Sequence, residues 1–490
     1  MSTTAPSLPD WARELESALE NCRVETDVDI VASMSRDQAP FAPAGQASAL
    51  VRARSIEHVI TTLRFANEKK IPVVTRGAGT GLAGGANAVD GCILLSVASM
   101  DRILRIDPAT RTAVVEPGVL NATLAEQVAT QGLFYAPDPA SRAISSIGGN
   151  IATNAGGSCC LKYGVTGDHV AALKVVTAQG ELIKTGAITA KNVAGLDLTR
   201  LFVGSEGTLG VIVEATLRLL RAARPASTFV AFFDSLAKAG QAIVALESRL
   251  DLSLLEVMDR TTLKAVDDLT RMALDTTAAA FVLAQSDASH AESIIEQCEP
   301  ICAALGARDC AITHDPDEGK LLLTARRMAL PALEKLGATL LDDVAVPRPR
   351  LATMIEEIER IAERHSLVIG TFGHAGDGNL HPTIVFDHHD NDSKKRAFAA
   401  FDEIVRAAMV LGGTIAGEHG IGTLKQPFMR DMVGQTEQAL MRQIKTCFDP
   451  NHILNPGKAY LRAQRTTGVK HRQSRRLPLT RDSRGNGKAS

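Results

Sequence analysis

Two hydrophobic periodicities alternate along the first half of this chain. Ser55–Lys69 places Ile56, Val59, Ile60 and Leu63 on one face at helical spacing, and therefore predicts an amphipathic helix. Short apolar runs bounded by turn residues are typical of strands. The predicted strands are Ile71–Val74, Cys92–Val97, Arg102–Asp107, Thr112–Glu116, Val170–Thr177, Glu181–Lys184 and Val211–Leu220, and further helices are predicted near Trp11–Asn21 and at Leu120–Gln131. This mixture indicates an α+β fold.

The pattern changes after the segment Arg221–Pro225. Long alanine- and leucine-rich helical stretches then alternate with short strands, and glycine becomes sparse until Gly370. A chain of 490 residues is also too long for one ordinary core. We therefore expect an N-terminal helical segment over 1–39, a first domain over 40–221, a second domain over 222–460 and a tail over 461–490.

The composition is that of a soluble globular protein, with 45% hydrophobic and 22% charged residues. No uninterrupted apolar run approaches the length of a membrane-spanning helix. The N-terminus carries acidic residues early and lacks the apolar segment of a secretory signal. We therefore expect a cytoplasmic protein, with peripheral attachment to the inner membrane as the alternative.

The net charge of −2 conceals a basic end. The tail from Leu461 holds nine Lys or Arg and one Asp, a balance of +8, which leaves −10 for Met1–Tyr460. An acidic body argues against nucleic-acid binding. The tail has little apolar content and is expected to be a disordered, solvated extension. The eight cysteines form no CxxC pair and no block spaced for an iron–sulfur cluster, so an iron–sulfur relay would require another polypeptide.

Three glycine-rich segments mark the first domain: RGAGTGLAGG, IGGNIATNAGG and GSEGTLG. The first contains Gly79–Gly84, which matches the GxGxxG dinucleotide fingerprint, but that fingerprint requires a helix to follow. Gly85–Gly91 cannot begin a stable helix, so a Rossmann NAD site is not expected. Glycine backbones can converge closely on an anion. Three such loops indicate a large planar cofactor with a pyrophosphate.

A second group of candidate residues lies near the C-terminal end. Ser366–Phe372 and Leu380–Phe386 are predicted strands, joined by a turn with the Asp-Gly and Gly-Asn steps of a hairpin. The hairpin places His374 and His381 at its base, and Glu418 follows in another glycine-flanked turn after a short strand. Two imidazoles and one carboxylate suit Zn²⁺, Mn²⁺ or Fe²⁺. On spacing alone, two ordinary polar histidines are an equal alternative.

Seven motifs occur in order over roughly residues 40–460: RGAGTGLAGG, PDPAS, SSIGGNIATNAGGSCCLKYG, KNVAGLDLTRLFVGSEGTLG, HAGDGNLHP, GEHGIG and FDPNHILNPGK. Together they resemble the FAD-linked oxidases of the vanillyl-alcohol-oxidase type. Within that group they are most similar to the branch of the glycolate oxidase catalytic subunit, D-lactate dehydrogenases and D-2-hydroxyglutarate dehydrogenase. The resemblance implies a two-subdomain FAD-binding domain followed by an antiparallel sheet covered by helices. It also implies oxidation of a small D-2-hydroxy acid to the 2-oxo acid, by hydride transfer to the flavin.

The resemblance further implies where FAD binds. No His or Cys lies between Arg76 and Gly85, so we expect non-covalent FAD, and we interpret Cys159 and Cys160 as structural. The pyrophosphate is expected on Arg76, Gly77, Ala78, Gly79, Thr80 and Gly81, the flavin along Pro139, Gly148, Gly149 and Thr153, and the remainder near Glu206, Gly207, Gly210, Ile212 and Asn455.

Roles in the second domain follow from the same resemblance. His419 is expected to be the general base, and Asn379 to contact the substrate. Arg326 resembles the arginine that pairs with the substrate carboxylate, with the adjacent Arg327 as the alternative. The expected ligands of a divalent metal are His374, His381 and Glu418.

Departures from the family pattern bear on the substrate. Leu340–Pro347 lacks the lysine of the D-2-hydroxyglutarate branch, so a second substrate carboxylate has no evident partner, which favours glycolate or D-lactate. Leu196 replaces the tyrosine usual in KNVAGYDL. Without an NAD fingerprint or cluster cysteines, we expect a quinone, a cytochrome, an electron-transfer flavoprotein or an iron–sulfur subunit as electron acceptor. D-2-hydroxyglutarate dehydrogenase, another alcohol oxidase and a non-catalytic flavin-binding subunit are the alternatives.

Overall fold

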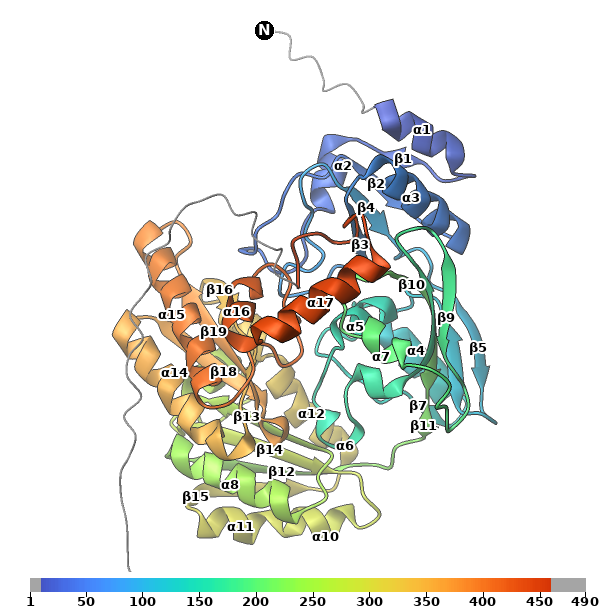
Figure 1. The fold of residues 1–490 in the computed structure, drawn as a ribbon. Coiled ribbons are helices and arrows are strands. Elements are labelled where there is room, and N and C mark those ends of the chain that lie inside the picture. Colours follow the sequence, from blue (N-terminus) through green and yellow to red (C-terminus); the bar gives the residue numbers. More distant parts are fainter. Residues whose placement is uncertain (1–9, 460–490) are drawn as a thin grey trace, which may run out of the picture.

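The computed structural model describes residues 10–459, and its N-terminal part contains a small, mostly parallel sheet (Figure 1). The strand order is β1-β2-β4-β3, in which β2, β4 and β3 are parallel and β1 is antiparallel to β2. The elements are α1 (Asp10–Ala18), β1 (Val24–Glu25), α2 (Val28–Ser33), β2 (Ala49–Arg52), α3 (Ile56–Lys69), β3 (Val73–Arg76) and β4 (Ile93–Ser96). The prediction for the basic tail lies outside the described residues.

A second sheet follows and is antiparallel, with strand order β5-β6-β10-β8-β9. Its strands are β5 (Ile103–Asp107), β6 (Thr112–Val115), β8 (Val170–Val176), β9 (Leu182–Gly186) and β10 (Val211–Arg218). The short strands β7 (Leu133–Phe134) and β11 (Leu220–Arg221) pair separately. The helices here are α4 (Asn121–Ala129), α5 (Ile147–Thr153), α6 (Cys160–Tyr163), α7 (Leu198–Phe202) and the 3-10 turn η1 (Thr166–His169).

The C-terminal part is built on one large antiparallel sheet of order β15-β12-β14-β13-β18-β19-β16, with β17 also paired to β19. Its strands are β12 (Ser227–Phe233), β13 (Leu254–Asp259), β14 (Ala280–Ser286), β15 (Ala307–Thr313), β16 (Ala338–Leu341), β17 (Val344–Ala345), β18 (Val368–His374) and β19 (Asn379–Phe386). The predicted antiparallel sheet covered by helices is confirmed.

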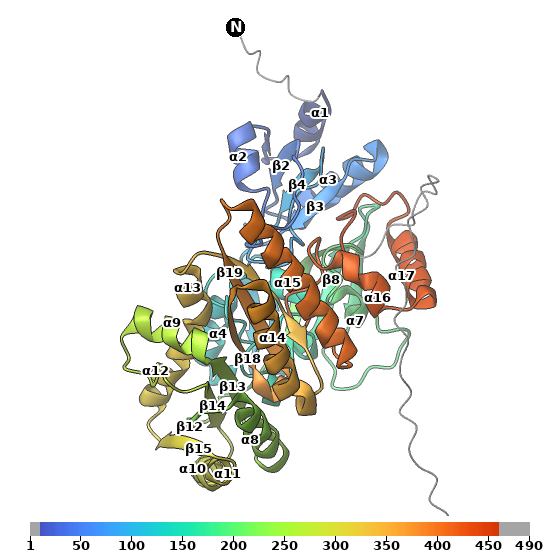
Figure 2. The ribbon, with the colours of Figure 1, turned by 90° about the vertical axis from the view of Figure 1, so that its left-hand side faces the viewer.

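Helices cover both faces of this sheet (Figures 1 and 2). One apolar core joins one face to α8 (Leu236–Arg249), α10 (Ala291–Glu296), α11 (Cys298–Ala304), α14 (Leu351–His365) and α15 (Asn391–Val410). A second core joins the other face to α9 (Arg260–Thr270), α12 (Pro316–Arg327) and α13 (Ala329–Glu334). The remaining elements are η2 (Arg348–Arg350), η3 (Ala375–Asp377), η4 (Gln426–Phe428), α16 (Met429–Met432) and α17 (Gln435–Phe448).

After α17 the chain returns to the N-terminal sheet (Figure 1). Leu454 forms a parallel bridge with Val73, and the backbone N–H of Asn455 donates to the carbonyl oxygen of Val73 at 2.8 Å. The last described segment therefore packs against the start of the first glycine-rich loop. Among residues 10–459, no helix combines the length and apolar content needed to cross a membrane.

Two local predictions differ from the structure. The second glycine-rich segment contains helix α5, because Gly148 packs where a Cβ would lie 2.6 Å from Cβ of Pro117 and so lets the helix approach that proline closely. The short strand predicted before Glu418 is reduced to a single bridge between Thr414 and Ala345. The loop after β3, in contrast, leads into strand β4 without a helix, as the absence of a Rossmann unit requires.

Candidate active site

A cavity of about 350 Å³ lies between the glycine-rich segments and the C-terminal part. Eight of its lining residues are glycines from the three glycine-rich segments, where the absence of a side chain allows close approach to the backbone. At its other end it is lined by Arg327, Leu330, Pro331, Glu418 and His419. The cofactor residues expected from the sequence that line it are Gly77, Ala78, Gly79, Thr80, Gly81, Pro139, Gly148, Gly149, Thr153, Glu206, Gly207, Gly210 and Ile212. This glycine-walled cavity fits a flat cofactor with a pyrophosphate.

Arg76 and Asn455 are buried and support the cavity rather than line it. The guanidinium of Arg76 packs under Gly79, where a Cβ would overlap it, and its Nη1 donates to the carbonyl oxygen of Arg36 at 2.7 Å. Gly79 has a φ of +75°, a conformation that glycine adopts without strain. Arg76 therefore supports the first glycine-rich loop from the side that faces away from the cavity.

Glu206 ties the C-terminal part to the third glycine-rich segment. Its two carboxylate oxygens accept the backbone N–H groups of Ile421 and Gly422, both at 2.8 Å. Burial raises the pKa of Glu206, although these two hydrogen bonds oppose the shift. Lys458, which the sequence reasoning missed, donates from Nζ to the carbonyl oxygen of Gly85 at 3.0 Å, and burial lowers its pKa to about 8.

The two candidate histidines lie on one face of the large sheet. In the pairing of β13, β18 and β19, Glu256 lies opposite His374, and His374 lies opposite Asn379. His381 is two residues beyond Asn379, so its side chain points to the same face. The strand register thus brings Glu256, His374, Asn379 and His381 together, as the hairpin prediction requires for the two histidines.

Glu418 completes this cluster. Its Oε1 lies 3.3 Å from Nε2 of His374 and 3.2 Å from Nε2 of His381. One ligand atom from each of the three side chains lies within 4.8 Å of the others. Two imidazole nitrogens and one carboxylate oxygen, all buried or half-buried, are a donor set that fits Zn²⁺, Mn²⁺ or Fe²⁺.

Charges in this cluster are strongly coupled. Burial disfavours the charged form of His374, but Glu256 and Glu418 outweigh burial and hold its pKa well above the usual range. Burial lowers the pKa of His381 to about 4, and only Glu418 opposes that shift strongly. Burial alone would raise the pKa of Glu418, yet His374 and His381 hold it well below its usual value. The two carboxylates thus favour positive charge on His374, and the imidazoles favour the ionised form of Glu418.

His419 and Asn379 flank the cluster. The imidazole of His419 stacks on that of His381, with ring centroids 5.0 Å apart and an interplanar angle of 14°. His419 lines the cavity, whereas Asn379 is buried and its Oδ1 has no hydrogen-bond partner among the described residues. A Cβ at Gly417 would overlap the amide of Asn379, so this glycine admits the side chain. The imidazole of His419 thus lies between the donor cluster and the cavity, with Nε2 3.7 Å from Oε1 of Glu418.

The adjacent arginines at the end of α12 point to different places. Arg326 is buried, its Nε lies 2.6 Å from Oε2 of Glu256, and its guanidinium carbon lies 4.7 Å from the ring centroid of Phe372. Arg327 is 42% exposed, lines the cavity and lies 3.8 Å from Asp138. Arg326 is therefore fixed beside His374, and Arg327 faces the glycine-rich segments.

Two buried carboxylates beside the histidines were missed. Glu256 lies in the run LLEVMD, where a single acidic residue inside an apolar strand is the one signal that could have singled it out. Asp343 lies in the segment Leu340–Pro347, which the sequence singled out only for its lack of a lysine and not for this carboxylate. Both side chains are 1% exposed and lie beside candidate metal-binding histidines. An isolated charge in a buried strand needs a partner, which was the available clue.

Comparisons with known proteins agree with this arrangement. Residues 47–186 match the FAD binding domain, and residues 223–459 match the FAD linked oxidases, C-terminal domain. Glycolate oxidase subunit GlcD of Bacillus subtilis is 41% identical over 86% of this chain and 91% of its own length. D-lactate dehydrogenase of Anaerostipes hadrus is 34% identical over 89% of this chain and 94% of its own length.

Among solved structures, p-cresol methylhydroxylase with substrate bound superposes with a TM-score of 0.77 over 91% of this chain and 96% of its own. Its sequence identity is 19%, so this likeness shows the shared fold alone. The two matched domains and the close relatives agree on the same kind of protein along most of the chain. The chain therefore belongs to the FAD-linked oxidases, a family of flavin-dependent oxidoreductases.

Proposed function

We propose that this chain oxidises a small D-2-hydroxy acid, glycolate or D-lactate by preference, to the 2-oxo acid, and passes the electrons to an acceptor other than NAD. The main observation in support is that Glu418 and His419 line the glycine-walled cavity. Glu418 also contacts His374 and His381. The metal-type donor set thus adjoins the cavity through Glu418, with His419 beside it. The names of the relatives, glycolate oxidase subunit and D-lactate dehydrogenase, support the same substrate class.

The cavity would hold non-covalent FAD, which would supply the acceptor for the C2 hydride. His374, His381 and Glu418 would hold a divalent ion, which would supply Lewis acidity for the 2-hydroxyl. The chain's own residues position and deprotonate the substrate. His419 accepts the hydroxyl proton, because its imidazole lies at the boundary between the donor cluster and the cavity. The Oδ1 atom of Asn379, which has no hydrogen-bond partner among residues 10–459, accepts a hydrogen bond from the substrate.

Arg326 is the proposed partner of the substrate carboxylate. Its guanidinium is held by Glu256 and Phe372 within the donor cluster, so its orientation is fixed before substrate binds. One arginine in that position suits one carboxylate. The segment Leu340–Pro347 contributes Asp342 and Asp343 to this region and no lysine. The nearby Lys425 is already paired with Asp342 at 2.7 Å, so a second substrate carboxylate has no evident partner, which disfavours a dicarboxylate such as D-2-hydroxyglutarate.

An electron-accepting partner is part of this proposal. The relative from Bacillus subtilis is named as a subunit, and the described part of this chain holds no cysteine cluster. We infer that a separate protein, such as an iron–sulfur subunit, takes the electrons. A non-catalytic flavin-binding subunit is the alternative from another class, and it predicts no reduction by any hydroxy acid.

The deciding experiment is anaerobic stopped-flow reduction of the bound FAD by a panel of D- and L-2-hydroxy acids. We expect glycolate and D-lactate to bleach the flavin rapidly, L-lactate slowly and D-2-hydroxyglutarate less than either monocarboxylate. Addition of NAD to the reduced protein should not restore the flavin absorbance. No bleaching by any acid in metal-loaded protein would contradict the proposed function.

A further inference from the structure

Behind each of the two candidate metal-binding histidines lies a buried carboxylate that neither contacts the substrate nor binds the metal in the proposed reaction. Glu256 lies behind His374, and Asp343 lies behind His381. Both carboxylates are 1% exposed, in a part of the molecule where an unpaired charge is costly. Charges buried this deeply need specific partners.

Glu256 divides its two oxygens between two functional side chains. Its Oε1 lies 2.7 Å from Nδ1 of His374, and its Oε2 lies 2.6 Å from Nε of Arg326. Because Glu256 and His374 are direct neighbours on paired strands β13 and β18, the sheet itself fixes their distance. Once Nε2 of His374 binds a metal ion, the ring keeps one proton, on Nδ1, and the Glu256 carboxylate can accept a hydrogen bond from it. Nε2 is left as the atom that faces Glu418.

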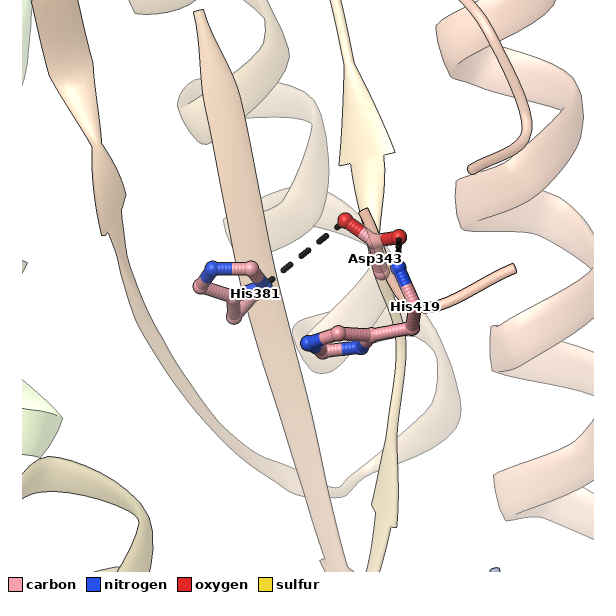
Figure 3. Close-up of side chains that lie close together, drawn as sticks. All are labelled: Asp343, His381 and His419. Carbon is pink, nitrogen blue, oxygen red and sulfur yellow. Dashed lines mark hydrogen bonds and ion pairs between the residues drawn. The ribbon is translucent and has the colours of Figure 1, made fainter. Parts of the chain in front are cut away.

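Asp343 is held on the loop that carries Glu418 and His419. Its Oδ2 accepts the backbone N–H groups of Gly417, Glu418 and His419 at 2.9, 2.9 and 2.8 Å. Its Oδ1 points to Nδ1 of His381 at 3.8 Å, as Figure 3 shows. Both of these atoms are buried without a hydrogen-bond partner among the described residues. A buried donor and a buried acceptor that face each other are most stable when paired.

The two histidines therefore share one pattern. Each has Nδ1 toward a buried carboxylate and Nε2 toward the same oxygen of Glu418. A carboxylate behind a ligating imidazole fixes its tautomer and ring orientation and raises its basicity as a ligand. We propose that Glu256 and Asp343 are positioning residues, each accepting the Nδ1–H of one histidine, so that both Nε2 atoms are presented to one metal ion held with Glu418. This inference rests on the metal site of the proposed function.

Asp343, His381 and His419 also form a second group whose ligand atoms lie within 4.8 Å of one another. A second ion there would use Nδ1 of His381 while Nε2 binds the first ion, which requires an imidazole without any proton. The ammonium of Lys425 also occupies this side of Asp343: its Nζ donates to the carbonyl oxygen of Asp343 and lies 2.7 Å from Asp342. These facts favour a hydrogen bond over a second ion.

The test compares Glu256→Gln and Asp343→Asn with the wild-type holoenzyme. An amide can donate as well as accept, so neither variant imposes a tautomer. Each protein is first freed of metal under conditions that retain FAD. It is then titrated with Zn²⁺ in competition with a chromophoric chelator. We expect a roughly 10- to 100-fold weaker Zn²⁺ affinity in each variant. When the site is loaded with Co²⁺, the visible absorption of the ion in each variant should differ from that in the wild-type chain, because the ligands are no longer held in one orientation.

Asp377→Asn is the matched control. Asp377 lies in the turn between the two strands that carry the histidines, and no hydrogen bond or ion pair joins it to either imidazole within residues 10–459. The substitution removes the same charge nearby without touching either Nδ1. Asp377 acts on His374 through space alone, so both Nδ1 contacts are kept in this variant, and we expect Zn²⁺ affinity to change by less than about threefold.

The outcomes separate this inference from the proposed function. If the wild-type chain binds no Zn²⁺ or Co²⁺, the metal part of the proposed function fails. If it binds one ion and both variants bind it equally tightly, the positioning roles fail. Two ions per wild-type chain would overturn the role of Asp343. Should a variant not fold, ¹⁵N-histidine NMR of the Zn²⁺-loaded wild-type chain decides, because metal on Nδ1 of either histidine contradicts the inference.

Discussion

The side-chain amide of Asn455 donates a 2.7 Å hydrogen bond to the carbonyl oxygen of Glu206, 249 positions earlier in the chain. The same amide donates to the carbonyl oxygen of Gly85 at 2.9 Å. Gly85 and Glu206 both line the cavity, whereas Asn455 does not. Asn455 therefore holds the first and third glycine-rich segments at a fixed separation, and its effect on FAD is exerted through them.

Replacing Asn455 with glycine should weaken FAD binding. Glycine tolerates the φ of +41° at this position, so the change removes two hydrogen bonds without adding backbone strain. Their loss is expected to cost about 2 kcal/mol, which corresponds to a roughly 30-fold weaker FAD affinity. The measurement is a fluorescence titration of the flavin-free protein with FAD.

Asn451→Gly is the control for this variant. The Asn451 amide also reaches a distant residue, Asn67, at 3.0 Å, but on an exposed surface. We expect its FAD affinity to match that of the wild-type chain. Equal FAD affinity in both variants would show that Asn455 does not hold the loops.

His419→Ala should slow reduction of the flavin without releasing FAD or metal. Removal of a general base lowers the rate by about 10²- to 10⁴-fold, and the proposed metal ligands are left unchanged. The measurement is anaerobic stopped-flow reduction by D-lactate, with the metal and FAD content of the same sample. His389→Ala, on an exposed turn, serves as the control. Wild-type reduction kinetics in His419→Ala would remove His419 from the base role.

The parts of the site that could be predicted from the sequence are those fixed by local signals. The glycine-flanked turn between β18 and β19 positions His374 and His381 through a short-range register, so the hairpin was recognisable. Helix α3 was likewise predictable, because its apolar stripe and its N-cap, Ser55, lie within one short segment.

What could not be predicted depends on contacts between distant segments. Glu256 meets His374 across 118 positions, and that proximity follows from a strand order that periodicity does not specify. Lys458 is buried under the first glycine-rich loop only because the chain returns there after α17. Helix α5 was hidden by its own glycines, whose low helix propensity is overridden by packing against Pro117.

Lysine substitution at the two adjacent arginines should distinguish their roles. Lysine keeps the charge but lacks the planar fork that matches a carboxylate. Because Arg326 lies within the donor cluster, Arg326→Lys should weaken substrate binding by roughly 10- to 100-fold, in line with hydrogen bonds to charged groups of about 1.5–3 kcal/mol. Arg327→Lys should change it less than about threefold, since Arg327 is partly exposed.

The measurement is the substrate concentration that half-saturates the anaerobic reduction rate, taken for both variants with glycolate and D-lactate. A larger effect in Arg327→Lys than in Arg326→Lys would transfer the substrate carboxylate to Arg327. If Arg326→Lys lowered the maximal reduction rate but left the half-saturating substrate concentration unchanged, Arg326 would stabilise the transition state and not the bound substrate.

Asp259 makes the stability of the sheet that carries the site dependent on pH. It ends β13 and caps α9, with Oδ1 accepting from the backbone N–H of Thr262 and Oδ2 from that of Thr371, both at 2.8 Å. Burial raises its pKa from 3.8 to about 6, although these hydrogen bonds oppose the shift. The fold therefore favours the protonated form. The contribution of Asp259 to the free energy of unfolding is therefore complete below pH 3.8 and is lost as the pH rises through about 6.

Comparison with Asp259→Asn tests this dependence, because asparagine has no charge at any of these pH values. The shift of the carboxyl pKa corresponds to about 3 kcal/mol in total, of which about 2 kcal/mol falls between pH 4.5 and 7. The unfolding free energy of the wild-type chain minus that of Asp259→Asn should therefore fall by about 2 kcal/mol over this interval. Urea denaturation at saturating FAD measures both. A difference that stays constant, or that grows as the pH rises, would mean that the fold stabilises the ionised carboxylate instead.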